Sequence, residues 1–309
     1  MAYSNDKAAG RPSKVLGRQG KVIEKIAPYM FLLPALLLLV VFTITPIINA
    51  VWLMFYDWNL ISPPKFVGLG NFHRLFRDRV FLKSIYNTLY FVAGSVPLSV
   101  LPALVLAWLF TKEWLKGRGI FEVIYFIPVI CGWVEVAMIW RFLLDSRVGL
   151  INYLLSFLGI GRIRWLTDPS IVMISVILVH AWKHVGYNTV IFHAAMNSIP
   201  KFYYEAAEID GASSWQMFKN ITVPLLMPII FFVTVVNTIW SFYVFPQVYV
   251  LTHGGPGYAS YTMVYYLYQY AFIRYDMGYA IASAMVLFAL ITLFAYLQGR
   301  ILTREVKFK

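Results

Sequence analysis

Four side chains that can bind a polar ligand fall on one face of an apolar segment: His180, Lys183, His184 and Tyr187. Their spacing of i, i+3, i+4 and i+7 is that of a single helical stripe. An ionisable side chain inside a membrane span costs about 2.5 to 3.5 kcal/mol, so it is expected to face protein or water. The stripe, with Asn188 beside it, therefore predicts one wall of a hydrophilic path.

Two simpler interpretations of Lys183 stay open. It can pair with Glu135 of another segment, or lie near the membrane surface with its ammonium in water. His180 and His184 are also spaced to bind a metal ion. No third ligand is evident, so we expect no metal site.

Two further segments carry polar and aromatic side chains that would complete such a path. Aromatic faces beside amide and hydroxyl groups suit sugars, whose C–H faces stack while their hydroxyls form hydrogen bonds. Packing between helices explains any one of these aromatic residues, but three mixed stripes together favour a cavity. The candidates are Asn237, Trp240, Ser241, Tyr243 and Gln247 in one segment, and Trp133 and Glu135, which follow Pro128, in the other.

The elements that must position these residues are membrane spans. Of the 309 residues 60% are hydrophobic and 13% charged, against about 25% charged in soluble domains. A span needs roughly 20 mostly apolar residues, and its backbone groups must be satisfied internally. We therefore predict an all-α membrane protein with six transmembrane helices, at about 28–53, 85–110, 120–140, 171–192, 221–250 and 280–302.

The net charge of +12 predicts orientation rather than nucleic-acid binding. Basic residues concentrate before residue 28, after residue 299 and in the loop with Lys112, Lys116 and Arg118. By the positive-inside rule these regions face the cytoplasm, so both termini and the polar segment at 201–224 are expected there.

That polar segment interrupts the apolar spans and reads as two short helices around a turn at 210–212. Its pattern of Glu205-Ala206-Ala207, Gly211, Ile221 and Pro224 resembles the EAA loop of the membrane subunits of binding-protein-dependent ABC importers. Residues 198–200, the outer turn and residues 278–280 resemble the carbohydrate branch of that family, and specifically the first of its paired sugar permeases. The outer turn consists of Gly254, Gly255 and Pro256.

The resemblance implies a MetI-like fold and a non-catalytic membrane subunit in the cytoplasmic membrane of a bacterium or archaeon. Its implied partners are a second, homologous permease, two ATP-binding subunits, an extracytoplasmic solute-binding protein and membrane lipid. ATP and Mg²⁺ would be bound by the ATPase, and no cofactor is expected in this chain. The residues implied to couple to the ATPase are Glu205, Ala206, Ala207, Glu208, Asp210 and Gly211.

We expect a basic cytoplasmic tail at 1–27, an anchor helix with its outer loop at 28–84, a permease core at 85–302 and a cytoplasmic tail at 303–309. The resemblance implies an oligosaccharide substrate. The basic stripe adds the hypothesis of an acidic, uronate-containing sugar, with a glycerol- or sugar-phosphate second.

A proton-coupled secondary transporter is the main alternative, with Glu135, His180 and His184 as its proton relay. The absence of visible inverted repeats and the presence of the EAA pattern argue against it. An enzyme is disfavoured because the sequence has no HExxH, GxSxG or phosphate-loop motif. A pure scaffold would not need the polar stripes.

Overall fold

The computed structural model describes residues 18–112 and 118–302. The predictions made for the terminal tails at 1–17 and 303–309, and for Lys116, lie outside the described residues. The chain divides into two units, residues 1–52 and residues 53–309.

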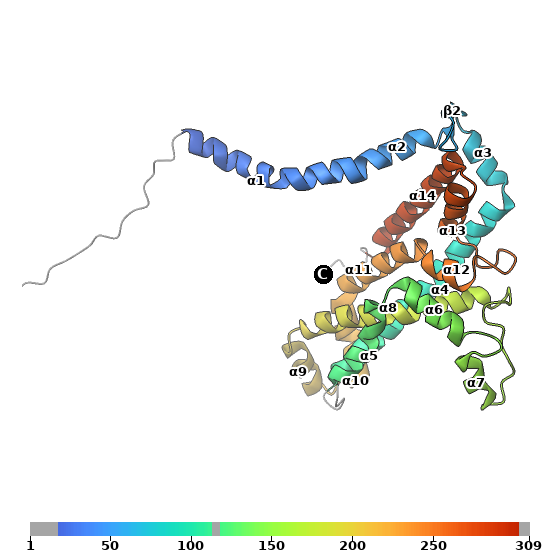
Figure 1. Cartoon of the computed structure of the whole chain (residues 1–309). Coiled ribbons are helices and arrows are strands. Elements are labelled where there is room, and N and C mark those ends of the chain that lie inside the picture. The colour runs from blue at the N-terminus through green and yellow to red at the C-terminus, as the bar shows by residue number, and fades with distance from the viewer. Residues whose placement is uncertain (1–17, 113–117, 303–309) are drawn as a thin grey trace, which may run out of the picture. The chain divides into compact units, whose positions relative to one another are not determined.

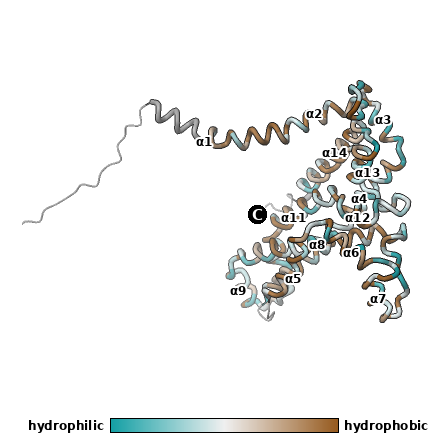
Figure 2. Tube along the Cα trace, viewed as in Figure 1, coloured by the Kyte–Doolittle hydropathy of each residue, from teal (hydrophilic) through white to brown (hydrophobic). Residues whose placement is uncertain are grey.

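The N-terminal unit is one long apolar helix with a local change of winding. It runs through α1 (Arg18–Leu39), the π-helical turn η1 (Val40–Ile44) and α2 (Thr45–Leu53). Pro46 has no N–H to donate to the preceding turn, which explains why the winding changes just before it. The Thr45 hydroxyl donates to the Val40 carbonyl at 2.9 Å. Residues 28–53 are long and apolar enough to cross a membrane, as predicted, and Figure 2 shows their hydrophobic character.

The second unit is built on α4 (Arg79–Phe110), α8 (Val172–Asn197), α11 (Val223–Phe242) and α14 (Met277–Leu302). Helices α4 and α8 pack along one another, and α11 packs against both α4 and α14 (Figure 1). Gly94 permits the close approach of α4 to α8, because a Cβ there would lie 2.8 Å from the Ile177 side chain. These helices supply most of the hydrophobic core.

The segment predicted as the third span is broken. Helix α5 (Arg118–Ile130) and helix α6 (Trp133–Leu143) meet at an angle of 104°. Pro128 lies in the last turn of α5, where its missing N–H and its ring disfavour a continuous helix. Both parts of the segment predicted for residues 120–140 are helical, and the break follows Pro128.

The fifth predicted span is also interrupted. Helix α11 ends at Phe242, and α12 (Pro246–Leu251) begins after three non-helical residues. Pro246 occupies the first turn of α12, a position that proline favours because no intrahelical N–H is needed there. The prediction of one helix across residues 221–250 was wrong at this point.

All six predicted segments contain helix, but the number of spans stays a prediction. Within the part of the chain that the structure describes, four helices are long and apolar enough to cross a membrane, or five if the bent α5–α6 pair is one span. Helix α8 has 26 residues and is long enough. Its polar stripe makes it less apolar than the others.

Short elements connect the long helices. The loop between α2 and α4 holds the antiparallel strands β1 (Tyr56–Asp57) and β2 (Lys65–Phe66), followed by α3 (Gly70–Arg77). The remaining elements are α7 (Leu150–Ser156), α9 (Phe202–Ile209), α10 (Ser214–Met217), η2 (Phe218–Thr222), α13 (Met263–Tyr268) and η3 (Gln269–Ile273).

The residue after strand β1 is hydrogen-bonded to the first turn of α14. The backbone amides of Met277 and Gly278 both donate to the Trp58 carbonyl, at 2.9 and 3.2 Å. A Cβ on Gly278 would collide with the Tyr56 carbonyl, so only glycine allows this approach. The loop between α2 and α4 and the last helix are thereby joined through their backbones.

The Asp78 side chain connects the start of α4 with α13, η3 and α14. Its Oδ1 accepts from the amides of Val80 and Phe81 as an N-cap, and its Oδ2 accepts from the Tyr266 hydroxyl at 2.7 Å. The Tyr270 and Tyr279 hydroxyls lie 3.2 and 3.4 Å from the same oxygen. Burial acts to raise the pKa of the Asp78 carboxyl, but these hydrogen bonds outweigh it and the pKa is lowered.

Candidate functional site

The two helix breaks face a common cavity of about 560 Å³. Helix α6 begins at one wall, α12 packs against α6, and α8 carries the predicted stripe past both. Non-helical backbone at membrane depth is tolerated where it lines a cavity, which accounts for both breaks occurring here. The cavity brings together eight of the predicted path residues: Trp133, His180, Lys183, His184, Tyr187, Trp240, Tyr243 and Gln247.

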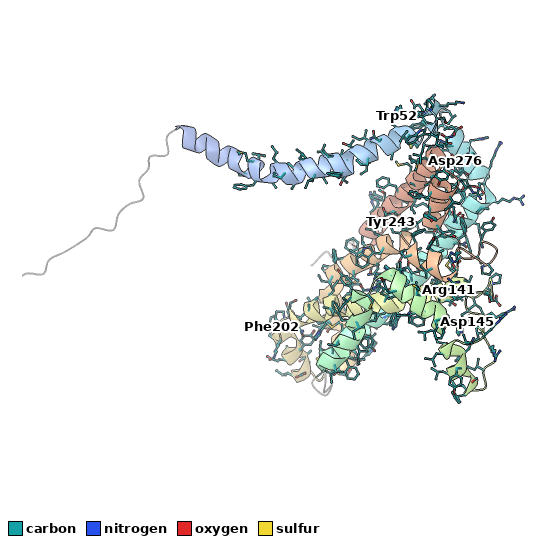
Figure 3. The ribbon with its side chains drawn as sticks, viewed as in Figure 1. Trp52, Arg141, Asp145, Phe202, Tyr243 and Asp276 are labelled. Carbon is teal, nitrogen blue, oxygen red and sulfur yellow. The ribbon has the colours of Figure 1, made fainter. Side chains whose placement is uncertain are left out.

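Aromatic rings form a continuous surface along this cavity. Trp133 stacks on His180 with a centroid separation of 5.3 Å and an interplanar angle of 12°. His184 stacks on Trp240 at 5.1 Å, and Tyr187 meets the same indole at 5.4 Å. Tyr243, labelled in Figure 3, follows the last turn of α11 and is 55% exposed. Flat apolar faces are thus presented by three different helices.

Gln247 provides a fixed amide at the cavity wall. Its Nε2 lies 3.0 Å from His180 Nδ1, while its buried Oε1 has no hydrogen-bond partner among the described residues. The Ser241 hydroxyl approaches His180 Nε2 at 3.5 Å. His180 is itself enclosed by Trp133 and by the edge contact with Phe91 at 5.0 Å. The imidazole therefore fixes its neighbours and is not open to solvent.

Lys183 neither forms an ion pair with Glu135 nor lies at the surface. Its side chain is buried, and its Nζ donates to the backbone carbonyls of Pro128, Val129 and Cys131 at 2.5, 3.2 and 2.6 Å. Among the described residues, no carboxylate lies within 4.0 Å of it. The predicted alternatives of an ion pair with Glu135 and of an ammonium in surface water are both wrong in this structure.

Four predicted path residues are not brought to the cavity. Asn188, Asn237 and Ser241 are almost completely buried behind its wall. The two asparagines donate to each other's Oδ1 at 3.0 and 3.1 Å, and the Ser95 hydroxyl donates to the Ser241 hydroxyl at 2.9 Å. Glu135 is exposed and lies outside the lining. The helical spacing was right, but the three buried side chains face neighbouring helices.

Three lining residues were not predicted. Val129 and Cys131 come from the α5–α6 break, and Pro246 from the α11–α12 break. Proline within an apolar run was the available signal at both places, and only the first was used. Among the described residues, no group of three or more metal-binding side chains could hold an ion.

The segment at 201–224 forms the predicted pair of short helices, α9 and α10. Gly211 ends α9 with φ +77°, in the left-handed region that favours glycine. Its amide donates to the Glu208 carbonyl at 3.0 Å, and the Ala212 amide donates to the Ala207 carbonyl at 2.9 Å. These two bonds are those of a Schellman motif. Ser213 and Gln216 then form a reciprocal capping box at the start of α10.

This hairpin presents an acidic and partly apolar surface. Glu205, Ala206, Glu208, Asp210 and Gly211 are exposed, and Ala207 is half-buried. Large apolar side chains stand out from the same hairpin: Phe202 (labelled in Figure 3), Tyr203, Ile209 and Trp215. The Tyr204 hydroxyl lies 2.9 Å from the Thr222 hydroxyl, which ties α9 to η2 and through it to α11.

The predicted outer turn is also present. Gly254 has φ +76°, and a Cβ there would lie 2.5 Å from the Tyr261 ring. The Gly255–Pro256 peptide is cis. The Ser260 hydroxyl donates to the Gly255 carbonyl at 2.7 Å. Asn87 of α4 donates to the carbonyls of Tyr258 and Tyr261, which fixes this turn to the long helix.

Apolar helices broken around an aromatic cavity, with a polar helical hairpin beside them, define a helical membrane transport subunit. Residues 67–307 match the family model described as the inner membrane component of binding-protein-dependent transport systems. The chain belongs to this family, and is therefore a multi-pass inner-membrane ABC transporter permease.

Its relatives extend over nearly its whole length. The probable ABC transporter permease protein YurN of Bacillus subtilis is 38% identical over 267 residues, covering 85% of this chain and 91% of YurN. The trehalose/maltose transport system permease protein MalF of Thermococcus litoralis is 35% identical, covering 87% and 90%. The sn-glycerol-3-phosphate transport system permease protein UgpA of Yersinia pestis is 33% identical, covering 91% and 96%.

A solved structure shares the fold. It is a crystal structure of a bacterial ABC transporter involved in the import of the acidic polysaccharide alginate. The TM-score is 0.82 at 25% identity, over 94% of this chain and 100% of the other. The same transporter type has also been solved in complex with an alginate pentasaccharide-bound periplasmic protein. The predicted MetI-like permease fold is confirmed.

Proposed function

We propose that this chain is one of two paired permeases in an ATP-driven, solute-binding-protein-dependent importer of oligosaccharides. The observation that carries the proposal is the cavity, because flat rings from α6, α8 and α11 line it together with the Gln247 amide and the Tyr187 and Tyr243 side chains. Stacking faces combined with a few fixed polar groups are the usual means of binding a polar ligand with apolar faces. Two relatives named for sugar or glycerol-phosphate transport support the same substrate class.

We further propose that the sugar is acidic, with uronate-containing oligosaccharides first and glycerol- or sugar-phosphates second. Lys183 places a positive charge in the wall. No described carboxylate pairs with it within 4.0 Å, and Glu135 offsets part of the charge through space. Because its donors are already engaged by carbonyls, this charge would act through space rather than by direct hydrogen bonds. The alginate importer that shares this fold supports the same preference.

The α9–α10 hairpin is proposed to couple the permease to its ATPase subunits. Its exposed carboxylates and apolar side chains offer a docking surface, and the Schellman motif at Gly211 gives the hairpin one defined shape. The hydrogen bond between Tyr204 and Thr222 would transmit a displacement of α9 towards α11 and the cavity. A second permease, two ATPase subunits and an extracytoplasmic binding protein complete the proposed assembly.

The experiment is ATP hydrolysis by the reconstituted complex with its binding protein, comparing acidic and neutral oligosaccharides. We expect stimulation by an acidic sugar. Gly211→Arg should abolish it, since a side chain at φ +77° is strained and a bulky cation would stand in the docking surface. Gly211→Asn should retain most of the stimulation because asparagine tolerates the left-handed region.

Gly161→Arg is a matched control, as nothing lies within 4 Å of a Cβ at that position. Stimulation by neutral sugars alone would support the proposed importer but contradict the proposed preference for acidic sugars. Unchanged coupling in Gly211→Arg would discard the assigned role of the hairpin. Import that continues when the partner ATPase is inactive would favour the proton-coupled carrier instead.

A further inference from the structure

Lys183 combines a cation with the end of an interrupted helix. Its ammonium has three N–H donors, and three carbonyl oxygens lie within hydrogen-bond distance: those of Pro128, Val129 and Cys131. These carbonyls belong to the last turn of α5 and to the residue after it. All three N–H groups of the ammonium can thus donate to backbone carbonyls at the end of α5.

The α5–α6 break needs such a partner. The last carbonyls of a helix have no intrahelical N–H, and at membrane depth water does not reliably replace it. The C-terminus of a helix also carries partial negative charge, which favours a cation beside it. Lys183 supplies both hydrogen bonds and charge, although it comes from a different helix, α8.

The contact between α5 and α8 is close at the same level. A Cβ on Gly186 would collide with the Tyr125 carbonyl of α5, so the two backbones touch one turn away from Lys183. Beyond the break, Trp133 is the first residue of α6, and Lys183 Nζ lies 5.2 Å from its ring centroid. One side chain therefore contacts the end of α5 and the first side chain of α6.

We infer that Lys183 is a positioning residue, which caps α5 from α8 and so holds the 104° bend that places Trp133 in the cavity wall. It does not bind the substrate directly, because none of its donors is left for a ligand. The inference concerns the construction of the cavity and does not depend on which sugar, or which other solute, passes through it.

The test uses Cys131, which is the sole cysteine of the chain, lies at the bend and is exposed. A nitroxide spin label on Cys131 in the assembled complex reports the mobility of the capped segment. Lys183→Met removes the hydrogen bonds and the charge. Lys183→Gln keeps a donor amide but removes the charge, and Lys183→Arg keeps both.

We expect the label to become several-fold more mobile in Lys183→Met and to stay close to the wild-type mobility in the Gln and Arg variants. Uptake should fall about tenfold or more in the Met variant, as expected for loss of hydrogen bonds to a charged group. Neutral substrates should lose uptake as well as acidic ones, because the cavity wall itself is disturbed, and the Gln variant should recover most of the neutral uptake. Lys65→Met, at an exposed lysine of β2, controls for the loss of a surface charge.

Wild-type label mobility in Lys183→Met overturns the inference. So does a Lys183→Met variant that keeps full neutral uptake and loses only acidic uptake, since that result limits the lysine to an effect of its charge on the ligand. If Lys183→Met fails to assemble, the Gln variant provides the test. Because its amide can still donate to the carbonyls of α5, a mobile label in that variant counts against capping. Absence of any sugar-stimulated ATP hydrolysis in the wild-type complex would instead count against the proposed function and leave the mobility test intact.

Discussion

Asn188 and Asn237 connect the two helices behind the cavity. Each donates to the other's amide oxygen, and Asn188 also donates to the Ser99 carbonyl of α4 at 3.0 Å. Both side chains are buried, so neither can exchange its partner for water without opening the bundle. Their position makes them part of the packing of α4, α8 and α11 rather than of the path surface.

A double-mutant cycle on this pair should show strong coupling. We expect Asn188→Ala and Asn237→Ala each to lower the free energy of unfolding by roughly 0.6 to 1.7 kcal/mol, the range for hydrogen bonds between transmembrane helices. The double variant should lose clearly less than the sum, because both changes remove the same bonds. Thermal unfolding of the purified complex measures this. Thr234→Ala, whose hydroxyl bonds only within α11, is the control, and additive losses would contradict the shared role.

Trp240 should contribute to ligand affinity through its exposed ring. It is 37% exposed and stacks with His184 on one side, which leaves indole surface for a ligand. We expect Trp240→Ala to raise the substrate concentration for half-maximal transport about two- to twelvefold, as an aromatic contact of about 0.5 to 1.5 kcal/mol predicts. Trp240→Phe should be milder.

Transport kinetics in proteoliposomes provide the measurement. Trp182→Ala is a matched control. Trp182, on α8, is an exposed tryptophan like Trp240, but it does not line the cavity. Equal effects at the two positions would show that loss of packing, and not of ligand contact, explains the change.

At the scale of elements, the carboxylate of Asp78 anchors the start of α4. Alanine removes both the N-cap and the tyrosine contacts, and caps alone contribute about 0.5 to 2 kcal/mol. Asparagine keeps the cap acceptor but weakens the contacts of the charged oxygen with the hydroxyls of Tyr266 and Tyr270. We therefore expect the melting temperature to fall in the order wild type, Asp78→Asn, Asp78→Ala.

Acid should remove the same stabilisation. The pKa of Asp78 is lower in the folded protein than the ordinary value of 3.8. Its contribution is therefore fully present above that ordinary value and is lost as the pH falls through the folded pKa. The difference in melting temperature between wild type and Asp78→Asn should be constant from pH 7 to about pH 5 and shrink below about pH 4. The exposed Asp57 supplies the control, Asp57→Asn; a constant difference down to the lowest pH would contradict the assignment.

Particular elements explain how far the sequence could predict the site. The period of 3.6 residues placed four residues of α8 on one face, and all four line the cavity. The acceptors of Lys183 are backbone carbonyls, which leave no trace in side-chain types. The pairing of Asn188 with Asn237 joins residues 49 positions apart, and local spacing cannot distinguish it from a shared path. Prolines at 128 and 246 marked both breaks, but proline also occurs inside the unbroken part of α4.

At the scale of the whole molecule, the predicted orientation can be tested directly. With six spans, the α9–α10 hairpin faces the cytoplasm and the loop after α7 faces outward. In a Cys131→Ser background, a single cysteine at Ser213 should react with a membrane-impermeant maleimide only after the cells are opened. A cysteine at Ser170 should react in intact spheroplasts. Both positions are exposed, so reactivity reports their side of the membrane. Labelling of both from the same side would rule out the six-span arrangement.

The backbone junction between β1 and the first turn of α14 has a consequence for building chimeric permeases. Trp58 accepts from Met277 and Gly278, and Asn71 donates to the carbonyls of Met54 and Tyr56. The first helix can therefore be replaced by that of another permease only if the replaced segment ends before residues 54–58. The boundary after Trp52 is the natural splice point. Grafts that carry their own residues 54–58 would need the matching start of the last helix from the same donor.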